Sequence, residues 1–87
     1  MNISVIDYIG KVHGGIAILL SWIIDGEYFE FIFWFDKNNE YKVYSSDKLN
    51  SKLGVEDIQK WSKLEYLIIY VNLIIPSKND IFNEFNI

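Results

Sequence analysis

Two long runs of branched and aromatic residues dominate the first half of the chain, and a polar pair separates them. The runs cover residues 16–24 and 27–35, and the pair is Asp25 and Gly26. Asp-Gly between two such runs is a strong signal for a two-residue β-hairpin turn, because the favoured turn needs positive φ at both positions. The pattern therefore predicts two antiparallel strands joined at Asp25 and Gly26.

A two-residue turn fixes which side chains face one another across the hairpin. One face is predicted to be almost wholly apolar, with Ile24 opposite Glu27, Trp22 opposite Phe29, Leu20 opposite Phe31, Ile18 opposite Phe33 and Ile16 opposite Phe35. The other face is mixed, with Ile23 opposite Tyr28, Ser21 opposite Glu30, Leu19 opposite Ile32 and Ala17 opposite Trp34. We expect the first face to meet the core and the second to meet solvent or a partner.

Apolar residues spaced three apart occupy the N-terminal segment and predict a short amphipathic helix over residues 2–13. They are Ile3, Ile6, Ile9 and Val12, and Val5 falls on the same broad face. Gly14 and Gly15 are expected to end this helix and to lead into the first strand, since glycine just past a helix readily takes the left-handed conformation.

Shorter elements are predicted after the hairpin. Residues 36–40 form a polar turn in which Asn38 and Asn39 tolerate positive φ, and residues 41–45 form a short strand whose register is open by one residue. Residues 46–53 are polar and are expected to be irregular.

The C-terminal third is predicted to contain a helix over residues 55–63, with acidic residues in its first turn. Residues 65–75 are rich in branched and aromatic side chains and predict the last strand, closed by Pro76, which cannot donate to a ladder. Asn79 is a candidate N-cap for a final short helix, and a C-terminal tail is the alternative.

These elements follow the order helix, three strands, helix, strand and, where the last one forms, helix. They predict a single α+β domain over residues 1–87, with two or three short helices on one face of a mostly antiparallel sheet of about four strands. A chain of 87 residues, 51% of them hydrophobic, is long enough for one core. Periodicity leaves the strand order open, because the last strand can lie beside the first or the third.

Charge and composition exclude several classes of function. The formal net charge is −4, and all eight basic residues are scattered lysines, so we expect no nucleic-acid partner. The chain has no cysteine, which excludes thiolate metal sites and thiol nucleophiles and is compatible with a cytoplasmic location. The apolar runs reach about half of the roughly 20 residues that a membrane helix needs, so no membrane span is expected.

Candidate catalytic groups are sparse. His13 is the only histidine, and no nucleophile elbow accompanies it. Glu30 is the sole charge within an otherwise apolar strand, and no second acid is predicted near it. The sequence lacks the phosphate-binding glycine motifs and the spacing of a calcium loop. We therefore predict no enzyme, no cofactor and no metal; a small hydrolase is the less favoured alternative, and it needs a concave polar pocket around Glu30 or His13.

The surplus of large apolar side chains is the most informative feature. A domain near this size buries only roughly 60–65% of its unfolded surface, so some of these side chains stay exposed. The mixed hairpin face then predicts a protein-binding patch, because tyrosine and tryptophan concentrate in protein interfaces. Its residues are Tyr28, Glu30, Ile32, Trp34 and Tyr44, with Asp25, Asp36 and Glu40 as steering charges. The alternative is that a helix covers this face and makes it ordinary core.

A small, acidic, cysteine-free and aromatic-rich chain is generically similar to immunity proteins, antitoxins and phage-encoded inhibitors of defence enzymes. The resemblance is one of type and transfers no residue. It implies an inhibitor that neutralises another protein, such as a toxin or a defence enzyme, by steric occlusion through the aromatic sheet face. The alternative is a structural subunit or homodimer in which the same patch pairs with itself.

Overall fold

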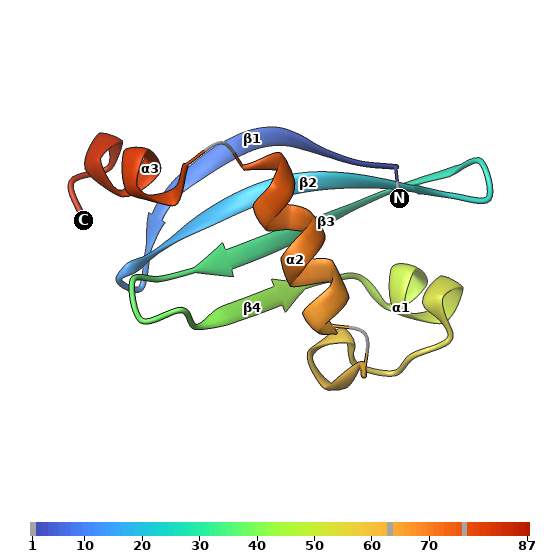
Figure 1. Ribbon diagram of the computed structural model, residues 1–87. Helices are drawn as coiled ribbons and strands as arrows, with labels where there is room; N and C mark the ends of the chain where they lie inside the picture. The colour runs from blue at the N-terminus through green and yellow to red at the C-terminus, as the bar shows by residue number, and fades with distance from the viewer. Residues whose placement is uncertain (1, 63, 76) are drawn as a thin grey trace.

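The computed structural model describes residues 2–62, 64–75 and 77–87. Within them the strands precede the helices: β1 (Asn2–Val12), β2 (Gly15–Ile24), β3 (Glu27–Phe35), β4 (Tyr41–Tyr44), α1 (Asp47–Leu53), the 3₁₀ turn η1 (Ile58–Lys60), α2 (Leu64–Ile74) and α3 (Lys78–Glu84) (Figure 1). The antiparallel sheet has the order β1-β2-β3-β4. The predicted α+β class and four-stranded sheet are confirmed. The predicted order of elements is wrong, because the sheet is complete before the first helix begins.

The central hairpin has the predicted turn and register. Asp25 and Gly26 have φ values of 50° and 77°, as a two-residue turn with two left-handed residues requires. All nine predicted cross-strand pairs occur, on both faces of the hairpin. The local turn signal therefore fixes the side chains that each face presents.

The N-terminal segment is strand β1, so the predicted helix over residues 2–13 is wrong. Its pairing with β2 shifts twice, and the shifts leave Ile6 and Ile9 without an opposite residue. Each β-bulge adds one residue to the alternation and changes the phase of the strand. The residues whose spacing of three predicted a helix therefore do not share one face of the strand: Ile3 is buried on the core side, whereas Ile6 and Ile9 fall at the bulges. Ile6 and Ile9 are exposed instead of lying on a buried helical face.

A second two-residue turn joins β1 to β2 at His13 and Gly14, where a helix end was predicted. Their φ values are 48° and 77°, the same left-handed pair as in the central hairpin. Histidine is among the residues that take this conformation more often than most. Gly15 does not end a helix either, because it is the buried first residue of β2.

The polar turn after β3 occurs as predicted, with Asn39 at a φ of 60°. It leads into β4, which ends at Tyr44, one residue before the predicted end at residue 45. Val43 lies opposite Phe33, so the register that the sequence left open now places Val43 on the core side and Tyr44 on the other side.

Residues 46–53 contain helix α1 and are not irregular. The Ser46 side chain caps the helix by accepting a hydrogen bond of 3.1 Å from the Leu49 backbone N–H. Gly54, with a φ of 74°, ends it in the left-handed conformation. The predicted helix over residues 55–63 is reduced to the single turn η1, and Lys63 lies outside the described residues.

Helix α2 occupies the segment that was predicted as the last strand, so that prediction is wrong. The helix buries Leu67 and Val71, which lie four residues apart on one face. Branched and aromatic residues on its remaining faces gave the segment the composition of a strand. Pro76, the predicted end of the strand, lies outside the described residues. The predicted final helix exists as α3, but its N-cap is Ser77 instead of Asn79.

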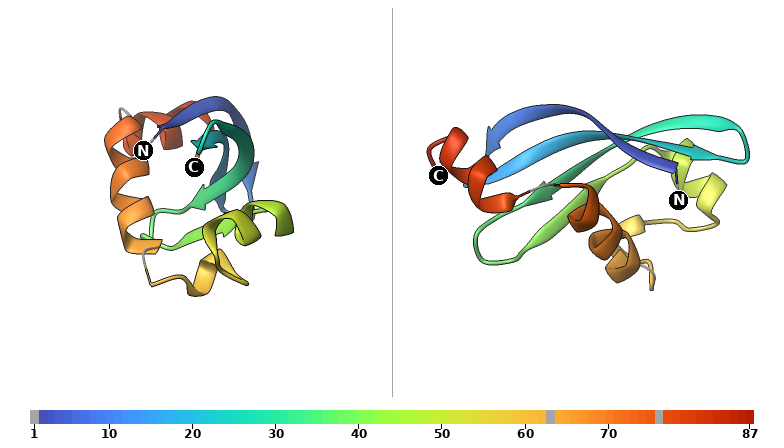
Figure 2. Two further views of the ribbon diagram at one scale, coloured as in Figure 1. Left: turned by 90° about the vertical axis from the view of Figure 1, so that its right-hand side faces the viewer. Right: turned by 45° about the horizontal axis from the view of Figure 1, so that its top comes forward.

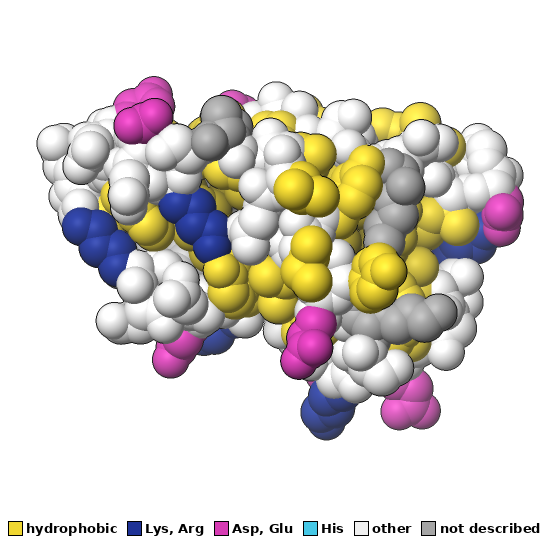
Figure 3. Space-filling view, viewed as in Figure 1, with side chains coloured by type: hydrophobic (Ala, Val, Ile, Leu, Met, Phe, Trp, Pro, Cys, Tyr) yellow, Lys and Arg dark blue, Asp and Glu magenta, His cyan; other side chains and the backbone are white. Residues whose placement is uncertain are grey.

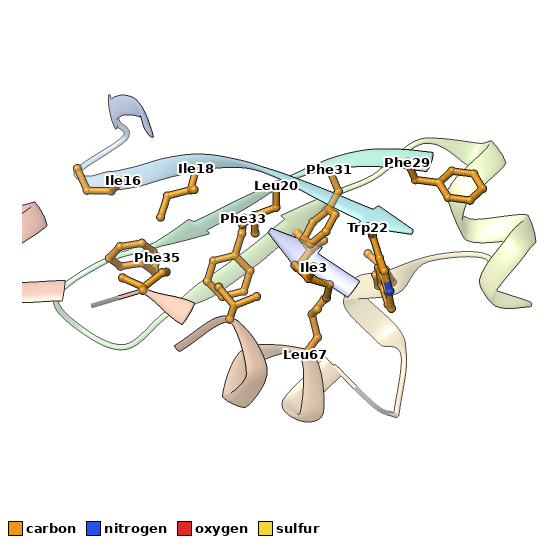
Figure 4. Packing of buried hydrophobic residues seen from close by; sticks show 14 of the residues in the cluster. Ile3, Ile16, Ile18, Leu20, Trp22, Phe29, Phe31, Phe33, Phe35 and Leu67 are labelled. Atoms are coloured by element: carbon orange, nitrogen blue, oxygen red, sulfur yellow. The ribbon is translucent and has the colours of Figure 1, made fainter. Parts of the chain in front are cut away.

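The core lies between the sheet and the helices. Ten sheet residues, among them Phe33 and Phe35, cluster with residues from every helical element, including Leu67 of α2. Figure 4 shows Phe33 and Phe35 on the same side of the sheet as Leu67. Helix α2 crosses the sheet on this side, and Figure 2 shows the two as separate layers. In the described part of the chain, no helix has the length and apolar character needed to cross a membrane.

Lys78 ties helix α3 to strand β4. Its ammonium group donates a hydrogen bond to the Tyr41 hydroxyl and lies 4.4 Å from the centroid of the Tyr41 ring. Burial raises the pKa of Tyr41, but hydrogen bonds from Lys78 and Asn72 and the charge of Lys78 lower it by more. The Tyr41 pKa therefore lies below its usual value of 10.0.

Candidate functional site

The sheet face opposite the helices, here called the outer face, keeps large side chains in contact with solvent. It is formed by Ala17, Leu19, Ser21 and Ile23 of β2, by Tyr28, Glu30, Ile32 and Trp34 of β3, and by Lys42 and Tyr44 of β4. Ile23, Tyr28 and Tyr44 are 45%, 56% and 54% exposed. The alternative in which a helix covers this face is therefore wrong for the described residues, since every described helix packs on the other side.

Trp34 is buried on the outer face without any helix above it. Its side chain is only 6% exposed, and it forms no part of the core cluster. The ring packs over Gly15, where a Cβ atom would lie 2.5 Å from two ring carbons. The Trp34 Nε1–H donates a hydrogen bond of 2.7 Å to the carbonyl oxygen of Val12. Trp34 therefore acts as a fixed floor that links β3 to the end of β1, and its ring is not free to insert into a partner.

A pocket of about 530 Å³ opens over this floor, at the end of the sheet that carries the turn at His13 and Gly14. Its apolar lining comes from Ile9, Val12, Ala17, Ile32, Trp34 and Tyr44, and its polar lining from His13, Asp36, Glu40 and Lys42. Five of the eight predicted site residues, Ile32, Trp34, Tyr44, Asp36 and Glu40, meet here. Ala17, which lies directly opposite Trp34 on β2, contributes a small side chain to this lining.

Asp36 is held in place by the turn that it begins. Its Oδ1 atom accepts hydrogen bonds of 2.9 Å and 3.0 Å from the backbone N–H groups of Asn38 and Glu40. The carboxylate is thus positioned at the edge of the pocket by the backbone, without help from another side chain. Lys42 brings the opposite charge, and its Nζ atom lies 5.2 Å from the centroid of the Trp34 ring.

Tyr28 and Glu30 lie on the outer face nearer to the tip of the central hairpin. The Tyr28 hydroxyl donates a hydrogen bond of 2.9 Å to Oε1 of Glu30. This hydrogen bond, together with the carboxylate charge, raises the pKa of Tyr28, because a phenolate would lose the bond and repel the carboxylate. Both side chains are exposed, and they extend the outer face beyond the pocket.

Asp25 does not join the other predicted steering charges. It lies in the hairpin turn at the far end of β2 and β3, where Lys52 of α1 approaches its carboxylate to 3.5 Å. Glu27 pairs in the same way with Lys48 of α1, at 3.2 Å. The charge of Asp25 is therefore partly balanced within the chain by a lysine of α1.

The β1 side of the pocket was missed by the sequence prediction. Ile9, Val12 and His13 line it, but the predicted helix placed them away from the sheet. The hairpin signal that would have located them is the left-handed pair His13 and Gly14 between two apolar segments. Lys42 of β4, which the sequence prediction did not include among the site residues, also lines the pocket.

A second exposed apolar surface, the α2 stripe, lies on the helical side. It consists of Tyr66, Ile69 and Leu73, which are 70%, 60% and 78% exposed. Figure 3 shows hydrophobic side chains gathered in the centre of this side of the molecule. The spacing of three and four residues places them on one face of α2, turned away from Leu67 and Val71.

The hydrolase alternative required a concave polar pocket around Glu30 or His13. His13 lines the outer-face pocket together with Asp36 and Glu40, whereas Glu30 is not among the lining residues. Among the described residues, no three histidine, aspartate or glutamate side chains are grouped as a metal site. Six of the ten lining side chains are apolar.

Comparison of the chain with protein-family models, with curated proteins and with solved structures finds no match. The function is therefore inferred from the arrangement of its own residues.

Proposed function

We propose that the chain is a protein-binding inhibitor that neutralises a larger partner, such as a toxin or a defence enzyme, by covering part of it with the outer face. The observation that carries this proposal is the exposure of Ile23, Tyr28 and Tyr44 on a sheet face that no described helix covers. Exposed aromatic side chains beside a pocket are typical of residues that anchor protein interfaces.

The outer face also has the rigidity that steric occlusion requires. Its residues belong to three hydrogen-bonded strands, and the Trp34 side chain is locked by its hydrogen bond to Val12. A surface that is already ordered loses little conformational freedom when it binds, so more of the contact energy is available for affinity. Docking of such a face blocks a partner's site without chemistry of its own.

The charges at the edge of the outer face favour a basic partner. Asp36 and Glu40 lie at the pocket end, Glu30 lies farther along β3, and the chain as a whole has a net charge of −4. Charges of this kind accelerate association with an oppositely charged surface, and salt reduces the effect. As part of the same proposal we place the chain in the cytoplasm. A protein without cysteine forms no disulfide bonds and therefore needs no oxidising compartment.

Two tyrosine variants on opposite sides of the molecule test this proposal. A partner is first captured on the immobilised chain from its native cell and then purified, and its affinity for each variant is measured. We expect Tyr44→Ala on the outer face to weaken binding by roughly 10- to 100-fold, as loss of an aromatic anchor does. Tyr66→Ala on the α2 stripe is the matched control and is expected to bind like the wild type. The opposite ranking would refute the outer face as the binding site.

A further inference from the structure

We infer that the outer-face pocket receives an arginine side chain from the partner protein. This inference rests on the proposed function, because it names the group by which a basic partner is held. The groups that line the pocket carry it: two carboxylates, two aromatic rings and several apolar side chains.

The carboxylates provide the charge that a guanidinium group needs. Asp36 is already fixed by two backbone N–H groups at 2.9 Å and 3.0 Å, so it pays little entropy when it accepts another donor. Both of these bonds end on Oδ1, so neither of them uses the second carboxylate oxygen. Glu40 lies four residues later in the same turn and is exposed. Two carboxylates on one edge suit the several N–H donors of arginine.

The rings indicate that the pocket favours a cation. The chain's own Lys42 places its ammonium group 5.2 Å from the centroid of the Trp34 ring, which lines the pocket. Tyr44 contributes a second ring, which is 54% exposed and available for stacking. A guanidinium group is planar and stacks on such a ring, whereas an ammonium group cannot.

The apolar lining matches the stem of a long side chain. Ile9, Ala17 and Ile32 also line the pocket and supply contacts for methylene groups. At about 530 Å³ the pocket is large enough for a whole arginine side chain. Long cationic side chains commonly bury their methylene groups on apolar surface while the charge reaches a polar edge.

The composition of the chain identifies the source of the arginine. All eight basic residues of this protein are lysines, so a second copy cannot supply a guanidinium group. The arginine that we infer for this pocket must therefore come from a different protein.

The probe for this inference is N-acetyl-arginine methylamide, with the norleucine analogue as its uncharged counterpart. Binding to the wild type is followed by NMR through the indole N–H signal of Trp34, which lies at the pocket floor. A ligand of this size that fits the pocket is expected to bind with a dissociation constant of the order of 1–10 mM. The norleucine analogue is expected to bind at least about fivefold more weakly.

Two charge variants should change the arginine affinity in opposite directions. Glu40→Gln removes a carboxylate and is expected to weaken binding by roughly two- to fivefold. Lys42→Met removes a competing cation and is expected to strengthen binding by a similar factor. Glu65→Gln makes the same charge change as Glu40→Gln on helix α2 and is expected to leave the affinity unchanged.

The outcomes separate this inference from the proposed function. Equal binding of the two analogues, or no shift of the Trp34 signal, overturns the arginine pocket even if Tyr44→Ala still weakens binding of the partner. Arginine binding combined with unchanged partner affinity in Tyr44→Ala overturns the proposed function, and with it the assignment of the arginine to the partner.

Discussion

Gly15 is the position at which one added methyl group should disturb the outer face most. A Cβ atom at residue 15 would lie 2.5 Å from the carbonyl oxygen of Phe35 and 2.5 Å from two ring carbons of Trp34. Non-bonded carbon atoms normally approach to about 3.5–4.0 Å, so the overlap with the ring is about 1 Å. The carbonyl oxygen belongs to a paired strand and the ring is hydrogen-bonded to Val12, so neither moves freely.

The expected cost of Gly15→Ala follows from this overlap. Overpacking in a well-packed site costs about 1–3 kcal/mol of unfolding free energy. For a domain of this length, that corresponds to a fall of roughly 5–20 °C in Tm. The neighbouring variant Gly14→Ala is the control, because a Cβ there meets nothing within 4 Å. Gly14→Ala carries only the strain of a left-handed residue, about 1 kcal/mol.

Thermal unfolding followed by circular dichroism measures both variants, and NMR reports the Trp34 indole N–H. We expect Gly15→Ala to be the less stable of the two and to shift the indole signal, while Gly14→Ala leaves that signal in place. If Gly15→Ala is at least as stable as Gly14→Ala and the indole signal is unmoved, Trp34 does not pack over Gly15. The pocket floor would then be misplaced.

Three further measurements address other parts of the structure. Because the pKa of Tyr41 is lowered in the folded state, its ionisation stabilises the fold fully above the unfolded pKa of 10.0, and this contribution is lost as the pH falls through the folded pKa. The difference in unfolding free energy between wild type and Tyr41→Phe, measured with urea, should therefore widen from pH 7 toward pH 10. A constant difference would contradict the contact with Lys78. Asp25→Asn removes the exposed ion pair with Lys52 and should lower the free energy of unfolding by less than about 1 kcal/mol. A loss of several kcal/mol in urea unfolding would contradict this expectation. Sedimentation of the chain alone at about 10 μM should give a monomer, because the outer face is proposed to bind a foreign protein; a dimer that Tyr44→Ala dissociates would favour the homodimer instead.

The parts of the fold that were predictable from sequence are those with a local signal. Asp25 and Gly26 fix a turn and, through it, the facing side chains of both flanking strands. Strand β1 was not predictable by periodicity, because bulges at Ile6 and Ile9 change its phase twice. Those bulges are visible only once β1 is paired with β2.

Helix α2 was predicted as a strand because its sequence shows little contrast between faces. Leu67 and Val71 have helical spacing, but apolar residues such as Ile69 and Leu73 fill its exposed side as well. The contrast between faces, which is the usual evidence for an amphipathic helix, is therefore weak in the sequence. Packing of α2 against the sheet favours the helix over a strand. This packing cannot be read from the composition of the segment.

The candidate site was predictable where it depends on the central hairpin and the turn that follows it. Ile32 was placed on the outer face from the register of the central hairpin. Tyr44 was assigned to the predicted patch while the register of its strand was open, and both residues line the pocket. Trp34 was placed on the correct face, but its burial over Gly15 depends on the bond to Val12, which β1 supplies. The position of His13 in the pocket lining was not predicted for the same reason, because His13 directly follows β1, which the sequence pattern did not identify as a strand.

The most direct test of the outer face as the binding surface is cross-saturation NMR on the complex with the purified partner. Saturation of the partner's protons should transfer to the side chains of Tyr28, Ile32 and Tyr44 and leave those of Tyr66 and Leu73 unaffected. Transfer to the α2 stripe with an unaffected outer face would contradict the account.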